Sequence, residues 1–194
     1  GEAIPEADRL AAAAGAVDPH VWHDPQLWRH AVEAIRDALI EQRPALRDEF
    51  TKNAETYLAE IAKADEEART ALADIPEERR VLITAHDAFH YFGRRFDIEV
   101  RGIQGTNTAT EAGVRQISDL ADFMVQRKIP ALFVESSVSP ATIEALKKAV
   151  EAKGGRVTIP GTLFSDAMGD AGTPEGTYVG MFRHNVRLIA EALK

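Results

Sequence analysis

Three segments of the sequence hold histidine and aspartate side chains of the kinds that bind transition metals. His20 and His23 lie just before a helix start, and His86 follows an apolar run. Asp166 lies in a loop between apolar residues and glycine. Neutral imidazole nitrogen suits Zn²⁺, and a carboxylate oxygen can complete the site. One histidine from each of the first two segments and one aspartate leave one coordination position open, so the residue types predict a metal site with an incomplete set of protein ligands.

His86 stands where a buried strand is predicted to give way to a helix. The run 80–85 has the composition of a buried strand, and a helical pattern begins at Asp87. Ligand sites in open α/β sheets gather at the carboxyl ends of the strands. Glu135 follows the predicted strand 131–134, and it is a candidate acceptor that orients a ligating histidine. The alternative for Glu135 is a solvated carboxylate beside a helix.

A competing chemistry starts from His86, Asp87 and His90, whose spacing is close to the H-E-x-x-H motif of zinc hydrolases. In that alternative, both histidines bind zinc and Asp87 serves as the general base. The motif normally lies inside a helix. Here His86 directly follows a strand, and His90 is expected about one turn into the helix. A binding protein is therefore favoured over an enzyme.

Composition limits the classes of function that the chain could have. The 194 residues are 45% hydrophobic and 28% charged, which is ordinary for a globular protein. The formal net charge of -8 argues against nucleic acid or an anionic membrane surface as the main partner. The absence of cysteine excludes disulfides, thiolate zinc sites and iron–sulfur clusters. The chain does not begin with Met or with a signal-like segment, so we expect a processed chain or a fragment.

Two helices are predicted before Pro76. Asp24 and Pro25 make a good helix start, and apolar residues then recur at helical spacing to Leu39. A second helical pattern covers about 44–75, which corresponds to a helix roughly 45 Å long. Such a helix must join two bodies, lie along the outside of one, or pair with another chain.

After Pro76, short apolar runs alternate with helical patterns. The predicted strands are 80–85, 98–103, 131–134 and 156–160, and the predicted helices are 87–95, 111–127, 140–153 and 176–193. Alternation of this kind predicts an α/β fold with a parallel sheet flanked by helices. The sheet would follow the long helix in the chain.

Four motifs in the same order resemble the zinc and manganese substrate-binding proteins of bacterial ABC transporters, the TroA-like group. They are DPHVWHDP at 18–25, TAHDAFHYF at 84–92, ALFVESSV at 131–138 and LFSDAMGDAGTPEGTYVGM at 163–181. The resemblance covers nearly the whole chain. It implies two α/β lobes joined by one long, rigid helix, with a metal ion held in the cleft between them.

The resemblance also implies roles for individual residues. His20, His86 and Asp166 match the positions of metal ligands, whereas His23 and His90 do not. The manganese-selective relatives tend to carry glutamate at the position of His86, and Mn²⁺ favours oxygen-rich sites. Zn²⁺ is therefore expected before Mn²⁺ or iron. Family members contribute a further histidine from an amino-terminal lobe, which we expect to be almost entirely missing here.

The resemblance divides the chain into three parts. Residues 1–25 would be a remnant of the amino-terminal lobe, 26–76 a helical segment that includes the long interlobe helix, and 77–194 the carboxyl-terminal α/β lobe. With the first lobe truncated, we expect weaker metal binding than in a complete receptor. We also expect self-association through the exposed apolar face of the long helix, because exposed apolar patches drive association.

These features predict the metal-binding component of an ABC transporter, which captures Zn²⁺ or Mn²⁺ and delivers it to the permease. The metal ion would be the transported ligand, and no catalytic step would be involved. The protein would work in the periplasm or another extracytoplasmic space, and its full-length form would be membrane-associated. Two alternatives stay open: the zinc hydrolase described above, and a dimerisation module in which the histidines are incidental.

Overall fold

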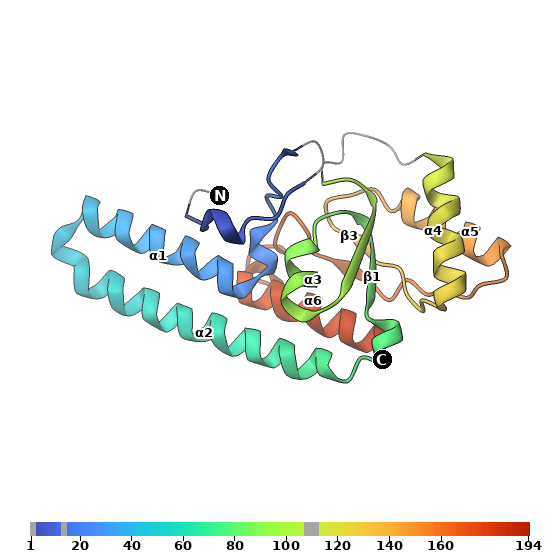
Figure 1. Cartoon of the computed structure of the whole chain (residues 1–194). Helices are drawn as coiled ribbons and strands as arrows, with labels where there is room; N and C mark the ends of the chain where they lie inside the picture. Colours follow the sequence, from blue (N-terminus) through green and yellow to red (C-terminus); the bar gives the residue numbers. More distant parts are fainter. Residues whose placement is uncertain (1–2, 13–14, 107–112) are drawn as a thin grey trace.

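A helical hairpin precedes an α/β body in this chain (Figure 1). The computed structural model describes residues 3–12, 15–106 and 113–194. The helices are α1 (Pro25–Gln42), α2 (Arg47–Ala73), α3 (His90–Phe96), α4 (Val114–Arg127), α5 (Ala141–Ala152) and α6 (Tyr178–Leu193). The strands are β1 (Val81–His86), β2 (Glu99–Gln104), β3 (Val134–Glu135) and β4 (Thr162–Leu163). Short 3₁₀ turns lie at Glu6–Asp8, Val21–His23, Pro44–Leu46, Glu77–Arg79 and Pro174–Gly176.

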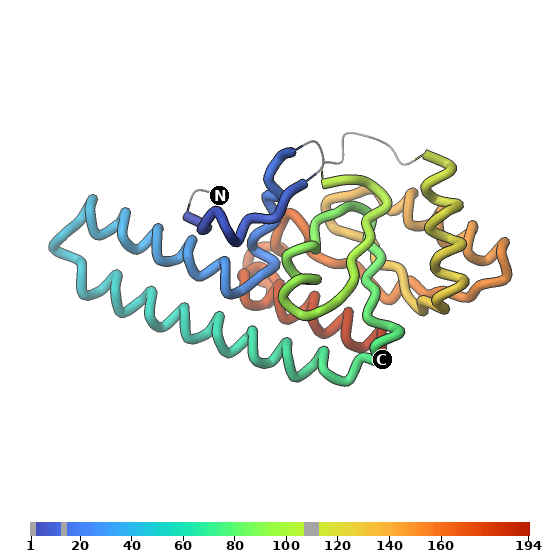
Figure 2. Tube along the Cα trace, in the orientation of Figure 1, coloured from blue at the N-terminus to red at the C-terminus, as the bar shows by residue number. Residues whose placement is uncertain are grey.

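Helices α1 and α2 lie side by side and antiparallel (Figure 2). Asp24 caps α1 as the sequence predicts, because its side chain accepts a hydrogen bond from the backbone N–H of Gln26 at 2.9 Å. The long helix begins at Arg47 rather than at 44, since Pro44 opens a 3₁₀ turn that reverses the chain. The long helix is thus partnered by a neighbouring helix of its own chain.

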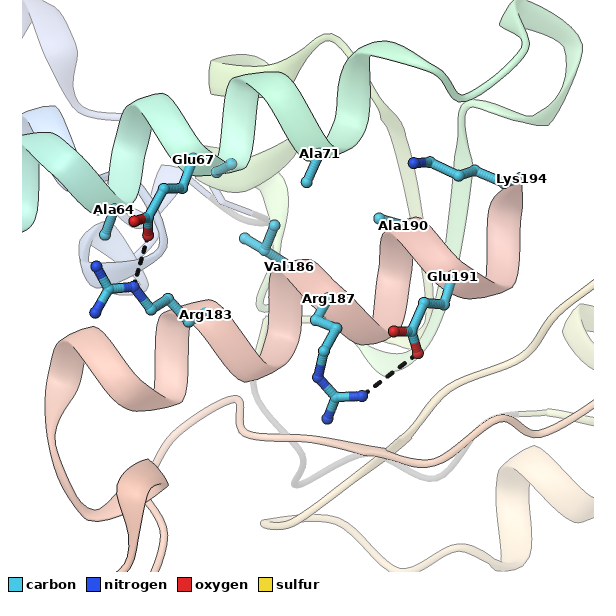
Figure 3. A pocket seen from close by; sticks show the side chains of 10 residues that line it. Ala64, Glu67, Ala71, Arg183, Val186, Arg187, Ala190, Glu191 and Lys194 are labelled. Atoms are coloured by element: carbon cyan, nitrogen blue, oxygen red, sulfur yellow. Dashed lines mark hydrogen bonds and ion pairs between the residues drawn. The ribbon is translucent and has the colours of Figure 1, made fainter.

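The other side of α2 packs on α6 through small residues. Ala64, Ala68 and Leu72 of α2 are no more than 2% exposed, and they belong to the same core as Val186 and Ala190 of α6. The seam leaves a groove of about 290 Å³. Figure 3 shows the seam and an ion pair across it, in which Nε of Arg183 lies 2.7 Å from a carboxylate oxygen of Glu67.

This packing corrects the expectation that the long helix exposes an apolar face. Within the described ranges, no large hydrophobic side chain of α2 is exposed. The exposed ones near the hairpin are Ile35 and Leu39 of α1 and Leu46 in the turn. Because α1 and α6 cover α2, the physical reason for self-association through α2 is absent.

The strands form parallel pairs, as predicted. β1 pairs with β2, and β3 pairs with β4. The backbone N–H of Phe133 donates to the carbonyl of Ile83 at 3.0 Å, which joins the β3 segment to β1. All six residues of β1 are buried. Leu82 faces a core that includes α2, α3 and α6, whereas Val81 and Ile83 face a core with α4 and α5, so helices cover both faces of the sheet.

Two predicted elements were wrong in position. Residues 156–160 do not form a strand, and only an isolated bridge joins Thr158 to Ala131 before β4 begins at Thr162. Pro160 has no N–H to donate to a strand ladder. The helix predicted from 87 begins at His90, because the N–H of Ala88 closes a tight turn onto the carbonyl of His86.

The remaining predicted elements lie close to those in the structure. The helix predicted over 111–127 runs from Val114, and residues 111 and 112 lie outside the described residues. Of the strand predicted at 131–134, only Val134 lies in β3, and Ala131 makes the isolated bridge to Thr158. Among the helices that the structure describes, none is long and apolar enough to cross a membrane.

Candidate metal centre

Three side chains from distant parts of the chain meet at the carboxyl end of β1. Potential ligand atoms of His20, His86 and Asp166 all lie within 4.8 Å of one another. The Nε2 atom of His20 is 3.4 Å from Oδ1 of Asp166, and the Nε2 atom of His86 is 3.4 Å from Oδ2. The structure therefore brings together all three residues that the sequence singled out as metal ligands.

The segment before α1 holds His20 through Asp18. The backbone N–H and the ring Nδ1 of His20 both lie within hydrogen-bond distance of Oδ1 of Asp18, at 2.9 and 2.7 Å. Asp18 is fully buried, and the phenol of Tyr91 donates to its carbonyl at 3.1 Å. With Nδ1 engaged by a carboxylate, Nε2 is the nitrogen left to face Asp166.

His86 is the last residue of β1, and Glu135 of β3 holds it in a similar way. The backbone N–H of His86 donates to Oε1 of Glu135 at 2.9 Å, and ring Nδ1 lies 2.6 Å from Oε2. Neither Nδ1 nor Oε2 has a regular hydrogen bond among the described residues, and the contact between them is an ion pair when the imidazole is protonated. The hydrogen bond from Phe133 to Ile83, which joins the β3 segment to β1, thus helps to place the carboxylate that the sequence suggested behind His86.

Asp166 lies in the loop after β4, and the hydroxyl of Ser137 holds it in place. The hydroxyl of Ser137 donates to Oδ2 of Asp166 at 2.9 Å and lies 2.7 Å from the hydroxyl of Ser165. The indole N–H of Trp22 donates to the Ser165 carbonyl at 2.7 Å. The Asp166 side chain is 35% exposed, whereas that of His86 is 1% exposed, so the carboxylate faces the solvent side of the cluster.

Sequence reasoning did not find two of the residues that support the cluster. Asp18 resembles an ordinary turn or cap residue in the sequence, and Ser137 lies in the motif at 131–138 without a role implied for it. The role of Ser137 depends on its contact with Asp166 across the fold, whereas Asp18 contacts His20 two residues on. The spacing of Asp18 two residues before His20 was the one available signal, because an Asx side chain commonly bonds the backbone two residues on.

The histidines and carboxylates of the cluster shift one another's pKa values in favour of the charged forms. Burial lowers the pKa of His86, but its contacts with Asp166 and Glu135 outweigh burial and raise the pKa to about 10. Burial likewise lowers the pKa of His20, and Asp166 and Asp18 raise it above its usual value. The two histidines hold the pKa of Asp166 well below its usual range. In the metal-free protein, protons therefore occupy positions that a divalent cation would take.

His23 and His90 lie outside this cluster. Burial lowers the pKa of His23 to about 3, and its ring stacks on Phe89 with centroids 4.2 Å apart. His90 is the first residue of α3, and its contact with Asp18 raises its pKa. Because His86 lies in a strand and His90 begins a helix, the two do not share the helix face that the zinc-hydrolase motif requires.

The α/β body brings together two histidines and one aspartate, a set of side chains that could hold a metal ion. The sequence model of the family described as "Zinc-uptake complex component A periplasmic" matches residues 2–192, and the chain belongs to this family. The resemblance to TroA-like proteins expected from the four motifs is thereby confirmed.

Individual relatives agree with this assignment. The chain is 48% identical to the zinc-binding protein TroA of Treponema pallidum over 99% of its own length. It is 46% identical to the manganese-binding lipoprotein MntA of Bacillus subtilis over 100% of its own length. The chain spans 62% of the length of TroA and 63% of the length of MntA.

Solved structures confirm the fold. The structure of the periplasmic zinc-binding protein TroA from Treponema pallidum matches with a TM-score of 0.96 at 48% identity, covering 99% of this chain and 69% of that one. Fe(III)-bound YtgA from Chlamydia trachomatis matches with a TM-score of 0.85 at 29% identity, covering 95% of this chain and 66% of that one. The predicted α/β class with a parallel sheet flanked by helices is correct.

Proposed function

We propose that this chain binds a divalent transition-metal ion, Zn²⁺ before Mn²⁺, through His20, His86 and Asp166. The observation that carries the proposal is the convergence of two imidazole Nε2 atoms on one carboxylate. Each imidazole also has its Nδ1 atom against a second carboxylate, from Asp18 or Glu135. Carboxylate–histidine pairs of this kind orient metal ligands and increase their basicity.

The donor set favours zinc. Two nitrogens and one or two carboxylate oxygens suit Zn²⁺ better than Mn²⁺, which prefers oxygen-rich sites and lies at the weak end of the affinity order. Three protein ligands leave a coordination position for water or for another donor. The names of the relatives include both metals, zinc for TroA and manganese for MntA, so both ions belong in a test.

We further propose that binding serves transport rather than catalysis. The chain would act as part of an extracytoplasmic receptor that captures the ion and passes it to the permease of an ABC transporter. The family description as a periplasmic zinc-uptake component and the lipoprotein relatives support this proposal. The division at 25 and 76 into lobe remnant, helical segment and α/β lobe stays a prediction. We do not extend the proposal to self-association, since α2 is covered by α1 and α6.

Calorimetric titration with Zn²⁺ and with Mn²⁺ tests the proposal. We expect one Zn²⁺ per chain, with weaker binding of Mn²⁺. His86→Ala should lower the zinc affinity by more than the roughly 10- to 100-fold that is typical of losing a residue behind a ligand. His30→Ala is the matched control, because His30 contacts Glu33 on the surface of α1. A chain that takes up no zinc, or a His86→Ala variant that binds like wild type, would overturn the proposal.

A further inference from the structure

Asp18 is a buried carboxylate with one oxygen well bonded and the other not. Its side chain is fully buried, and Oδ1 lies within hydrogen-bond distance of both the backbone N–H and Nδ1 of His20. Oδ2 has no regular hydrogen bond among the described residues. A buried charge with an unpaired oxygen is costly, so whatever faces Oδ2 influences how firmly Asp18 is held.

The group that faces Oδ2 is His90, at the start of α3. Its Nδ1 atom lies 3.4 Å from Oδ2 of Asp18, and its Nε2 atom lies 3.6 Å from Oδ1 of Asp87. Asp87 in turn accepts a hydrogen bond from the backbone N–H of Gly102 at 2.8 Å. A continuous line of polar contacts therefore leads from β2 through Asp87 and His90 to Asp18 and His20.

Helix α3 holds the backbone of Asp18 as well as its side chain. Tyr91, the residue after His90, donates its hydroxyl to the carbonyl of Asp18 at 3.1 Å and accepts from the backbone N–H of Leu10 at 2.8 Å. Two successive residues of α3 thus contact Asp18. Tyr91 contacts its backbone carbonyl, and His90 lies beside Oδ2 of its side chain. The contact with Tyr91 holds the backbone of Asp18, and the contact with His90 adds to those of Oδ1 with His20 in limiting rotation of the carboxylate.

We infer that His90 is a positioning residue of the metal centre, which holds Asp18 so that His20 keeps its proton on Nδ1 and turns Nε2 toward Asp166. The inference rests on the proposed function and adds a role that the three ligands alone do not provide. A carboxylate behind a ligating histidine fixes both its tautomer and its ring orientation. His90 acts on His20 only through Asp18, and it does not itself meet the ion.

Zinc calorimetry on a graded set of His90 variants tests this inference. His90→Asn retains an N–H donor near the position of Nδ1, whereas His90→Gln carries its donor farther out, near Nε2. We expect His90→Ala and His90→Gln to weaken zinc binding by about three- to tenfold, less than the roughly 10- to 100-fold known for direct partners of ligands. His90→Asn should bind nearly as well as wild type, and His30→Ala again serves as the control.

The tautomer of His20 gives a readout that a purely structural role would not change. Nitrogen-15 spectra of the metal-free protein, recorded at a pH high enough for His20 to be neutral, should show a single tautomer of His20 with Nδ1 protonated in wild type and in His90→Asn. In His90→Ala and His90→Gln the spectra should show both tautomers. Thermal melting of each variant identifies any that fails to fold. If His90→Ala does not fold, the comparison of His90→Asn with His90→Gln still tests the inference.

The outcomes separate this inference from the proposed function. If wild type binds no zinc, the proposed function fails, and the inference fails with it. If wild type binds zinc, His86→Ala does not, and every His90 variant matches His30→Ala in affinity and in the His20 tautomer, only the inference is overturned. A zinc affinity in His90→Asn as low as in His90→Gln would also overturn it, because the two would then share a defect unrelated to the donor position.

Discussion

At the scale of single residues, each imidazole of the cluster has one ring nitrogen against a carboxylate and the other turned toward Asp166. The Nδ1 atoms of His20 and His86 lie 2.7 and 2.6 Å from carboxylate oxygens of Asp18 and Glu135. These contacts prepare both Nε2 atoms to donate to a metal ion. They also stabilise the protonated imidazoles, so protons and metal ions compete for the same nitrogens.

We expect the affinity for Zn²⁺ to rise as the pH increases from about 6.5 toward 10. Burial lowers the pKa of His86, but Asp166 and Glu135 raise it to about 10, so below that pH the ion must displace a proton. Calorimetry in two buffers of different ionisation enthalpy should detect release of about one proton or more per zinc at neutral pH. An affinity that stays constant over this interval would contradict the prediction.

The raised pKa of His86 makes the stability of the metal-free fold fall as the pH rises. The folded-state pKa of His86 lies above its unfolded value of about 6.5, so its ion pairs stabilise the fold fully below that pH. This contribution is lost as the pH rises toward about 10. Metal binding and metal-free stability therefore respond to pH in opposite directions.

At the scale of elements, the position of α3 depends on a close approach between Gly93 and the chain leading into β2. A Cβ atom on Gly93 would lie 2.5 Å from the carbonyl oxygen of Ile98 and 2.6 Å from a methyl carbon of Val100. The backbone N–H of Ile98 also donates to the carbonyl of Gly93 at 3.0 Å. Only a residue without a side chain lets α3 sit this close to the sheet.

Gly93→Ala should therefore lower the free energy of unfolding by about 1–3 kcal/mol, the usual cost of overpacking a tight core. Gly105→Ala is a matched control, because a Cβ atom there meets nothing within 4 Å, and its effect should stay within about 0.5 kcal/mol. Urea denaturation of the metal-free proteins measures both values. Equal stability of the two variants would show that α3 can move away from β2 without cost.

Sequence patterns predicted the elements that local chemistry determines. The Asp24–Pro25 helix start and the fully buried strand β1 have local signals, and both are present. The strand expected at 156–160 and the helix expected from 87 were misplaced, because apolar periodicity does not show which backbone groups find partners across the fold. The packing of α2 on α6 and the support that Ser137 provides to Asp166 are long-range contacts, and no short window of sequence contains them.

At the scale of the whole molecule, the candidate ligands come from three separate parts of the fold. His20 precedes the helical hairpin, His86 ends the central strand, and Asp166 follows the last strand. An ion held by all three would connect the segment before α1 to both parallel strand pairs. The unfolded chain does not bring these residues together. The free energy of metal binding would therefore add to the free energy of unfolding.

We expect saturating Zn²⁺ to raise the melting temperature of the chain. At a free zinc concentration 100 times the dissociation constant, the gain is about 2.7 kcal/mol. Chelation with EDTA should reverse the increase, and His86→Ala should show little of it. Thermal melting followed by circular dichroism measures the shift, and an equal increase in His86→Ala would mean that zinc acts elsewhere on the protein.

The uneven exposure of the cluster has a kinetic consequence. The Asp166 side chain is 35% exposed, while the side chains of His20 and His86 are 4% and 1% exposed. If the cluster binds a metal ion, a hydrated ion arriving from solvent would meet the carboxylate first and exchange its water for imidazole nitrogen afterwards. Release would follow the reverse sequence, with Asp166 as the last protein contact. The lifetime of the bound ion would then depend on the buried histidines, and its rate of capture on one exposed carboxylate.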